Sequence, residues 1–374
     1  MAAFLYIHIP FCIRKCAYCD FPSQPYDSRL AGDYVRALCR ELALRRDEAE
    51  ELKTVFLGGG TPSMLPEASL CAVFSSIREN YRIARDAEIT IEANPGTIGR
   101  SKLAALTGLG INRLSIGVQS FVDAELAVLG RAHSAEDARA AVECAGEAGF
   151  ENISLDLMYG IPCQTRDSWL ASLRQAVSLG PEHVSAYELT PEQRTPLCSD
   201  IGSGTLVLPQ EDDVVRMSDD AIDLLEEHGY ERYEISNYAR PGFRCIHNLN
   251  YWERGEYLGI GAGAHSFIGS RRSHNTADIR QYVSLLEQAA SAEAGSLDIT
   301  GKEAARETLF LGLRKTEGID LKQAGLLLPG LVPASADLIA QGLLGEDRGR
   351  LRFTREGMRV SNSVLVQLFE NLGL

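Results

Sequence analysis

Short runs rich in β-branched residues alternate with segments of helical periodicity along the first half of the chain. The runs are FLYIHIP, TVFLGGG, AEITIEAN, NRLSIGVQS, NISLDLMYG and EHVSAYELT. Strands that are separated by helices pair in parallel through right-handed crossovers. Several runs are apolar at consecutive positions, which is typical of strands covered on both faces. The pattern predicts an α/β fold, and six such units fit a partial (β/α)6 barrel better than an open two-sided sheet.

We expect the chain of 374 residues to have three parts. Residues 1–190 carry the six units and form the barrel core. Residues 191–299 extend the barrel with an amphipathic helix over residues 211–228 and a run rich in glycine and aromatic residues. Residues 300–374 predict several short helices followed by the hairpin-like GRLRFTREG, a pattern typical of a small winged-helix-like module.

The composition limits the classes of binding partner and the cellular compartment that we expect for this protein. The formal net charge is −14, from 51 acidic and 37 basic residues, and such a surface repels phosphate backbones. We therefore expect no nucleic acid partner. No apolar run is long enough to cross a bilayer, and the apolar N-terminal stretch lacks the basic leader and cleavage site of a signal peptide. The nine cysteines do not form a dense paired framework, so we expect a cytoplasmic protein.

Three cysteines, Cys12, Cys16 and Cys19, follow the first predicted strand with the spacing C-x3-C-x2-C. A structural zinc site needs four ligands, and no second cysteine pair follows, although His8 or Cys39 could supply a fourth ligand. Iron–sulfur clusters are held by thiolates, normally four of them. Three thiolates leave one iron open for a reactant, which favours a reactive cluster. A zinc-stabilised barrel without redox chemistry remains the alternative.

Polar residues stand at or near the carboxyl ends of several predicted strands. The second strand ends in the glycine turn LGGGTP (57–62), where backbone can approach a ligand without Cβ obstruction. Glu92, Gln119 and Asp156 lie in later strands, and Arg131 follows Gln119. The working face of a barrel is its C-terminal face, so these side chains are expected to converge there. Carboxylates accept hydrogen bonds from hydroxyls or an ammonium, and an arginine can clamp a carboxylate.

The cysteine spacing, with Tyr18 inside it, resembles the cluster motif of the radical S-adenosylmethionine (SAM) superfamily. The resemblance implies a [4Fe–4S] cluster on Cys12, Cys16 and Cys19, whose open iron binds SAM. The wider pattern resembles the oxygen-independent coproporphyrinogen III oxidase family. The residues that this resemblance assigns to SAM binding are Tyr6, Tyr18, Gly59, Gly60, Thr61, Glu92, Gln119, Arg131 and Asp156.

Two departures from the oxidases point to a sister branch. Phe21 stands where the oxidases carry a further cysteine, and the chain lacks their extension before the first strand. The motif H-N-x-x-Y-W, present here as residues 247–252, is similar to that of the radical SAM heme chaperones (HemW family). This resemblance implies binding of heme, an electron donor, and delivery of heme to acceptor proteins, membrane-associated ones included, from the cytoplasm or its membrane surface. It disfavours oxidase activity, the alternative function, and leaves open whether SAM is cleaved in turnover.

The H-N-x-x-Y-W segment also has a chemistry of its own. A neutral histidine is the commonest protein ligand of heme iron, so His247 is the candidate axial ligand, with Cys245 as its rival. Tyr251 and Trp252 could offer flat apolar surface to a porphyrin, and nearby arginines could meet its propionates. The run GIGAGA (259–264) lacks the context of a dinucleotide-binding loop and predicts tight backbone packing near the barrel mouth, with His265 a candidate neighbour of SAM or substrate.

Overall fold

The computed structural model describes residues 2–374 and is built around one nine-stranded sheet. All six predicted strands are present, and neighbours along the chain pair in parallel. They are β1 (Ala2–Ile9), β4 (Ala49–Gly59), β5 (Arg82–Ala93), β6 (Arg113–Gln119), β7 (Ile153–Tyr159) and β8 (His183–Glu188).

Strands from the second part of the chain complete both ends of this sheet. β11 (Leu258–Ile260) pairs in parallel with β1, and β10 (Asn237–Ala239) pairs antiparallel with β8 and with β9 (Glu231–Arg232). The sheet therefore runs in the order β11-β1-β4-β5-β6-β7-β8-β10-β9. Within residues 2–374 its two edge strands do not pair with each other, so the barrel is partial, as predicted.

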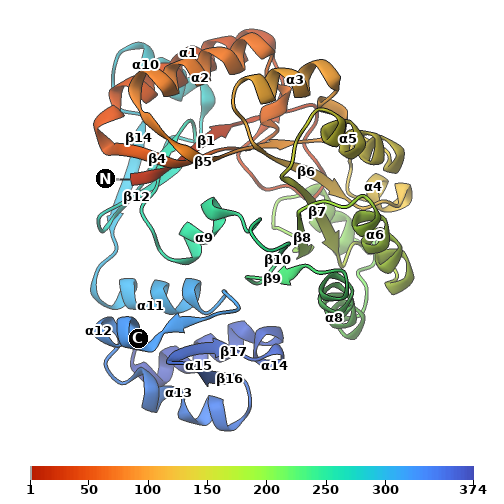
Figure 1. Ribbon diagram of the computed structural model, residues 1–374, viewed down its shortest axis with the longest axis vertical. Helices are drawn as coiled ribbons and strands as arrows, with labels where there is room; N and C mark the ends of the chain where they lie inside the picture. The colour runs from red at the N-terminus through yellow and green to blue at the C-terminus, as the bar shows by residue number, and fades with distance from the viewer. Residues whose placement is uncertain (1) are drawn as a thin grey trace.

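Helices cover the outer side of the curved sheet (Figure 1). Their starts are set by short polar side chains: Asp27 accepts a hydrogen bond from the Leu30 amide (2.7 Å), and Ser134 and Thr165 begin reciprocal capping boxes. The helices before residue 300 are α1 (Ser28–Leu44), α2 (Glu67–Asn80), α3 (Arg100–Gly108), α4 (Asp123–Val128), α5 (Ala135–Glu147), α6 (Arg166–Ser178), α7 (Pro196–Gly202), α8 (Glu211–Glu227), α9 (Ile246–Trp252) and α10 (Ile279–Glu287). No helix among residues 2–374 is both long and apolar enough to cross a membrane.

Helix α9 is the exception to this arrangement, because it lies on the inner side of the curved sheet (Figure 1). The sequence predicts this segment only as a glycine- and aromatic-rich run. A small antiparallel sheet of β12 (His265–Ile268), β13 (Arg271–Asn275) and β14 (Glu293–Asp298) follows it. The segment 191–299 thus adds strands to the barrel sheet and side chains to the same hydrophobic core.

The C-terminal part has a hydrophobic core of its own, between Ala305 and Leu368. The predicted hairpin is present, and a further short strand pairs with it to make a three-stranded sheet. Two helices follow the hairpin that the sequence pattern does not anticipate. The elements are α11 (Gly301–Gly312), β15 (Ile319–Asp320), α12 (Leu321–Leu327), α13 (Leu331–Ala340), β16 (Leu344–Asp347), β17 (Arg350–Phe353), α14 (Arg355–Arg359) and α15 (Ser361–Leu372).

One buried carboxylate ties the first helix to the segment that follows the barrel units. Glu41 on α1 is only 3% exposed. It accepts hydrogen bonds from the Gly261 amide (2.8 Å), the Tyr282 hydroxyl (2.6 Å) and the Asn275 side-chain amide (2.7 Å). A Cβ on Gly261 would lie 2.5 Å from the Tyr34 hydroxyl, so the run GIGAGA packs tightly against α1, as predicted.

This network predicts a large loss of stability in the variant E41A. The substitution leaves three buried donors without an acceptor, and we expect the free energy of unfolding to fall by about 3 kcal/mol. Urea denaturation followed by circular dichroism measures the change. The variant E143A, which alters an exposed glutamate of α5, is the control and should unfold like the wild type.

Candidate functional site

The three cysteines lie on one closed loop at the carboxyl end of β1. The short strand β2 (Phe11–Cys12) pairs in parallel with β3 (Gln24–Pro25), and the Tyr26 amide donates to the Cys12 carbonyl oxygen (2.9 Å). These contacts close the base of the loop, so its cysteines are held outside the end of the sheet. This is the face on which barrel proteins build their sites.

The barrel anchors the same loop from its far side. The Ala17 amide donates to the Leu129 carbonyl oxygen (3.0 Å), and the Leu197 amide donates to the Ala17 carbonyl oxygen (2.9 Å). Two sulfur atoms accept hydrogen bonds from barrel side chains: Cys12 from Thr61 (3.7 Å) and Cys16 from Arg131 (3.4 Å). The positions of the Cys12 and Cys16 thiols are therefore fixed by the fold.

The donor set fits an iron–sulfur cluster. Cys12, Cys16 and Cys19 are all partly accessible to solvent. Burial raises the pKa of the Cys19 thiol, and the neighbouring Cys16 and Cys12 raise it further, so these two residues lie close enough to disfavour the ionisation of Cys19. Bound irons would relieve that repulsion. Among residues 2–374 no three metal-ligating side chains converge on one point, whereas a cubane takes each thiolate on a separate iron.

The glycine turn at the end of β4 lies directly against the cysteine loop. The Gly60 amide donates to the Ile9 carbonyl oxygen (2.9 Å), and the Thr61 amide donates to the Phe11 carbonyl oxygen (2.7 Å). A Cβ on Gly60 would lie 2.7 Å from that Phe11 oxygen, and a Cβ on Gly59, whose φ is 110°, would lie 2.4 Å from the His8 ring. Only glycine fits these positions, and the result is a backbone cradle beside the thiols.

Glu92 lies on β5 next to this cradle. Its carboxylate accepts a hydrogen bond from the Gly59 amide (3.1 Å). Burial, together with the negative charge of Asp156, raises the pKa of Glu92 to about 7. Asp156 lies in the middle of β7, whereas the sequence predicts it at or near the carboxyl end of the strand, and it accepts a hydrogen bond from Ser115 (3.2 Å). Burial raises the pKa of Asp156 as well, so the inner side of the sheet holds two carboxyls that resist ionisation.

The two carboxyls open onto a cavity of about 310 Å³ on the inner side of the sheet. Arg113 is the cation of this cavity, and the sequence analysis missed it because it stands at the first position of β6. Its Nε atom is buried without a hydrogen-bond partner. The cavity is lined by Phe56, Glu92, Arg113, Ser115, Asp156, Ser185, Tyr187, Ser236, Asn237 and Asn248.

Arg131 is already engaged by the protein. Besides Cys16, its guanidinium donates to the Gly117 carbonyl oxygen (2.6 Å) and to the Asn94 side-chain oxygen. Asn94, a second residue that the sequence analysis missed, also donates to the Thr61 hydroxyl (2.8 Å). Arg131 therefore links the cysteine loop to the barrel. Its predicted role as a clamp for a ligand carboxylate would require some of these bonds to be exchanged.

The remaining predicted SAM residues lie around the same mouth. Gln119 accepts a hydrogen bond from the Tyr187 hydroxyl (2.5 Å) and has a left-handed backbone with a φ of 68°. Tyr18 lies beside Arg131, and burial raises the pKa of its phenol. The Tyr6 hydroxyl is 3.1 Å from Nδ1 of His8. The His8 ring in turn packs beside the glycine cradle, at Gly59.

His247 is buried inside the barrel and has both ring nitrogens in hydrogen bonds. Nδ1 is 2.6 Å from the Thr54 hydroxyl, and Nε2 is 2.9 Å from the Tyr251 hydroxyl. Burial, with the nearby positive charge of Arg113, lowers the pKa of His247 to about 3. The side chain is 1% exposed, so it does not reach a porphyrin in this structure. Axial ligation by His247 stays a prediction that requires α9 to move.

Glu88 on β5 holds the start of α9 in place. Its carboxylate accepts hydrogen bonds from the amides of Ile246 (2.9 Å) and His247 (3.0 Å). The rival ligand Cys245 is also buried there, and burial raises the pKa of its thiol to about 12. The H-N-x-x-Y-W segment is thus built into the barrel, and Glu88 is a structural partner that the sequence analysis missed.

Other residues considered for ligand binding lie away from the mouth. Arg244 and Arg254 are paired with Glu231 (3.1 Å) and Glu307 (3.0 Å). His265 is exposed on β12, where its ring stacks on that of His274.

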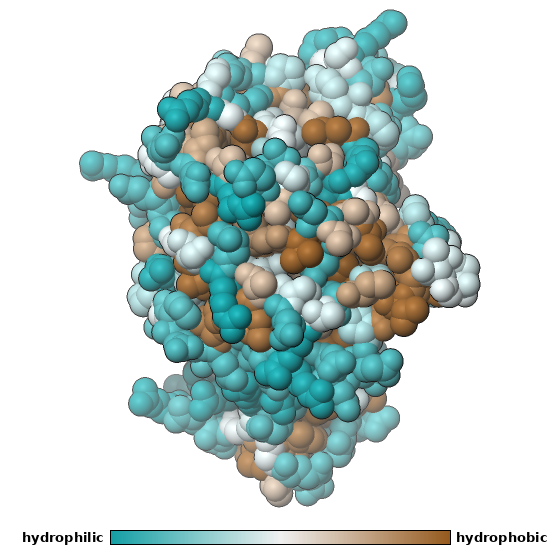
Figure 2. Space-filling model, turned by 90° about the vertical axis from the view of Figure 1, so that its right-hand side faces the viewer, coloured by the Kyte–Doolittle hydropathy of each residue, from teal (hydrophilic) through white to brown (hydrophobic). Residues whose placement is uncertain are grey.

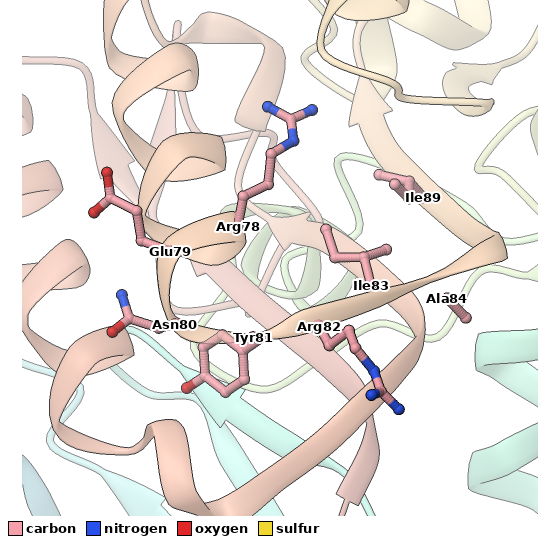
Figure 3. Close-up of a pocket in the computed structure, with 8 residues that line it drawn as sticks. All are labelled: Arg78, Glu79, Asn80, Tyr81, Arg82, Ile83, Ala84 and Ile89. Carbon is pink, nitrogen blue, oxygen red and sulfur yellow. The ribbon is translucent and has the colours of Figure 1, made fainter.

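A further hollow, shown in Figure 3, is lined by residues 78–84 and Ile89 at the end of α2 and the start of β5, with no cysteine or histidine among them.

The raised pKa of Glu92 predicts a pH-dependent stability. Its pKa of about 7 lies above the value of about 4.3 for an exposed glutamate, so the native state binds the proton more tightly than the unfolded state. This contribution is fully present below pH 4 and is lost as the pH rises to 7 and beyond. Between pH 5 and 8 the free energy of unfolding of the cluster-free protein should fall by roughly 2–3 kcal/mol relative to E92Q. Urea titrations of both proteins measure this, and parallel pH profiles would contradict it.

The chain is similar to known proteins over most of its length. The sequence model of the radical SAM superfamily matches residues 6–176, and that of the HemN C-terminal domain matches residues 299–360. The chain is 38% identical to the heme chaperone HemW of Bacillus subtilis (strain 168) over 96% of this chain and 97% of that protein. It is 43% identical to the heme chaperone HemW of Escherichia coli (strain K12) over 71% of this chain and 70% of that protein.

The fold also matches a solved structure over nearly its full length. The coproporphyrinogen III oxidase (HemN) of Escherichia coli, a radical SAM enzyme, superposes with a TM-score of 0.85 at 24% identity, covering 98% of this chain and 89% of that chain. At this identity the likeness shows the fold alone. The relatives from Bacillus and Escherichia decide the family: the chain belongs to the heme chaperone HemW family of the radical SAM superfamily.

Proposed function

We propose that this protein is a radical SAM [4Fe–4S] protein that binds heme and delivers it to acceptor proteins. The observation that carries the proposal is the likeness to a heme chaperone over 96% of the chain. The open three-cysteine loop beside a glycine cradle supports it, because that geometry serves a cluster with one free iron. Heme is the cargo, and the acceptors are the heme proteins to which it is passed. A cytoplasmic location and an external electron donor belong to the same proposal.

Cys12, Cys16 and Cys19 would hold the cluster, and the chain's other residues would position SAM. When bound, the cluster supplies an iron that the amino and carboxylate groups of SAM can chelate and an electron for its reductive cleavage. The cradle at Gly59 and Gly60 lets a small ligand contact backbone next to the thiols. Arg131 donates a hydrogen bond to the Cys16 sulfur and so helps to hold it in position.

The proposed SAM contacts follow from the groups that face the mouth. Glu92 and Asp156 offer carboxyl groups, which suit the sulfonium, the ribose hydroxyls and the amino N–H groups of SAM. Tyr6, Tyr18, Thr61 and Gln119 would complete the set. The fold that the chain shares with the oxidase does not by itself favour coproporphyrinogen III as a substrate, so we do not propose oxidation.

Reconstitution without oxygen tests the cluster and the heme together. Wild-type protein loaded with iron and sulfide should show cluster absorption and should then shift the Soret band of added heme. The variant C12A should lose the cluster absorption almost completely, whereas C71A, which alters an exposed cysteine on α2, should keep it.

Three results would contradict the proposal. They are a full cluster in C12A, a wild type that binds one zinc but no iron, and stoichiometric decarboxylation of coproporphyrinogen III in the presence of SAM and a reductant. The third of these would show that the protein is an oxidase.

Ionisation of Glu92 predicts how SAM binding depends on pH. The pKa of about 7 means that the carboxyl is mostly protonated at pH 6 and mostly ionised at pH 8. An ionised carboxyl attracts the positive charge of SAM, so the affinity of the reconstituted protein should rise between pH 6 and 8, by up to about tenfold. Isothermal titration of wild type, E92Q and the surface control E143Q measures it. The rise should be smaller in E92Q than in wild type and E143Q, because only the deprotonation of the SAM amino group contributes to it there. An equal rise in all three proteins would contradict the assignment.

A further inference from the structure

A second and larger cleft, of about 710 Å³, lies between the barrel and the C-terminal module. Tyr159, Gly160 and residues 187–191 contribute from the ends of β7 and β8, and α8 contributes along its length. Arg355, Met358 and Arg359 of α14 face it from the module. Tyr187 and Ser236 line both this cleft and the inner cavity, so the two spaces are neighbours.

The barrel side of the cleft is largely apolar. Val214, Val215 and Ile222 project from α8, and Leu208 precedes this helix. Met358 adds an apolar group from the module. On the side of the molecule seen in Figure 2, hydrophobic residues gather in the middle, and a hydrophilic band separates them from the narrow lower end. The cleft thus joins apolar surface to a polar margin.

The polar margin is rich in arginine. Four arginines line the cleft, against two glutamates, Glu188 and Glu211; they are Arg232, Arg314, Arg355 and Arg359. Arginines thus outnumber glutamates among the lining residues, in a chain whose net charge is −14, although Asp219 and Asp223 pair with Arg355 and Arg359 and offset this excess. Such a local excess of arginine favours a ligand that carries carboxylates.

Arg314 is the arginine with unused hydrogen-bonding capacity. Its Nε atom is buried and has no partner, and one terminal nitrogen donates to the Asn362 side-chain oxygen over 3.3 Å. Leaving a buried donor unpaired costs free energy that a bound acceptor would return. The nearby Glu234 does not accept this bond.

The two arginines of α14 are paired across the junction. Arg355 contacts Asp223 (2.7 Å) and Asp219 (3.2 Å), and Arg359 contacts Asp219 (2.7 Å). These pairs join the module to α8 above the cleft. They are partly exposed and therefore contribute little stability, so a ligand carboxylate can take the place of an aspartate at small cost.

We infer that this cleft is the docking site of heme, an inference that rests on the proposed function. Heme is a planar ring with two apolar faces and two propionates on one edge. The ring would lie against Val214 and Met358, and the propionates would bind Arg314 and the arginines of α14. The volume lies within the range of sites that take ligands of this size.

The cleft also suits a ligand that is to be passed on. Its lining contains no histidine or cysteine, and among the residue types that are usual axial ligands of heme it holds only Tyr159, Tyr187 and Met358. The affinity would come from the ring faces and the propionates, and so the heme could leave without breaking a strong axial bond.

Heme titration of the reconstituted full-length protein tests the inference. The Kd should rise about tenfold in R314A, since one charge-assisted hydrogen bond is lost, and more in V214W, whose ring fills the apolar wall. R306A on α11 and V366W on α15 are the matched controls outside the cleft and should bind like the wild type. Iron protoporphyrin IX dimethyl ester, which lacks the carboxylates, should bind wild type and R314A equally weakly.

The outcomes separate this inference from the proposed function. If wild type, R314A and V214W all bind heme with the same affinity, the cleft is not the heme site. The proposed chaperone function then still stands. A wild type with an intact cluster that binds no heme overturns both. Cluster absorption and thermal unfolding are recorded for each variant, so that a misfolded protein is recognised. If R314A is misfolded, R314Q replaces it, because this variant removes the same charge and keeps more of the side chain.

Discussion

The pairing of β1 with β4 is the contact on which the candidate site depends. It sets Ile9 opposite Gly59, and the two strands then end together at the mouth of the barrel. From there, the amides of Gly60 and Thr61 bond the carbonyl oxygens of Ile9 and Phe11, so the glycine turn is held against the start of the cysteine loop. A shift of the register by one residue would move the cradle away from the thiols and turn the flanking side chains to the other face.

Buried carboxylates do two kinds of work in this molecule. Glu41 and Glu88 accept hydrogen bonds from backbone amides of later segments, and these bonds hold β11 and α9 against the barrel. Glu92 and Asp156 face a cavity instead, and burial raises their pKa values, as it does that of Glu41. Carboxyls of the first kind stabilise the fold, and those of the second kind leave interaction free energy for a ligand.

The sequence predicts well what depends on local periodicity. All six parallel strands, the cysteine loop and the hairpin of the module follow from it. The sequence pattern places Asp156 at or near a strand end, because it does not show how far the strand continues. It does not reveal β11 or the inward position of α9, because three-residue strands and short helices carry no period and are fixed by distant partners such as Glu88. Asn94 and the cleft are missed because their contacts come from segments far apart in the chain, and Arg113 is missed because it stands at the first position of β6.

The position of α9 explains why the two proposed ligands would occupy different spaces. Helix α9 fills the inner side of the sheet, and the cavity left beside it measures about 310 Å³. A cavity of that size next to the cradle suits a small polar ligand such as SAM, whereas the outer cleft of about 710 Å³ suits a large planar ring. Tyr187 borders both and donates to Gln119 at the mouth. Movement of the Tyr187 side chain would therefore change the lining of both spaces. This is a physical route by which occupancy of one site could influence the other.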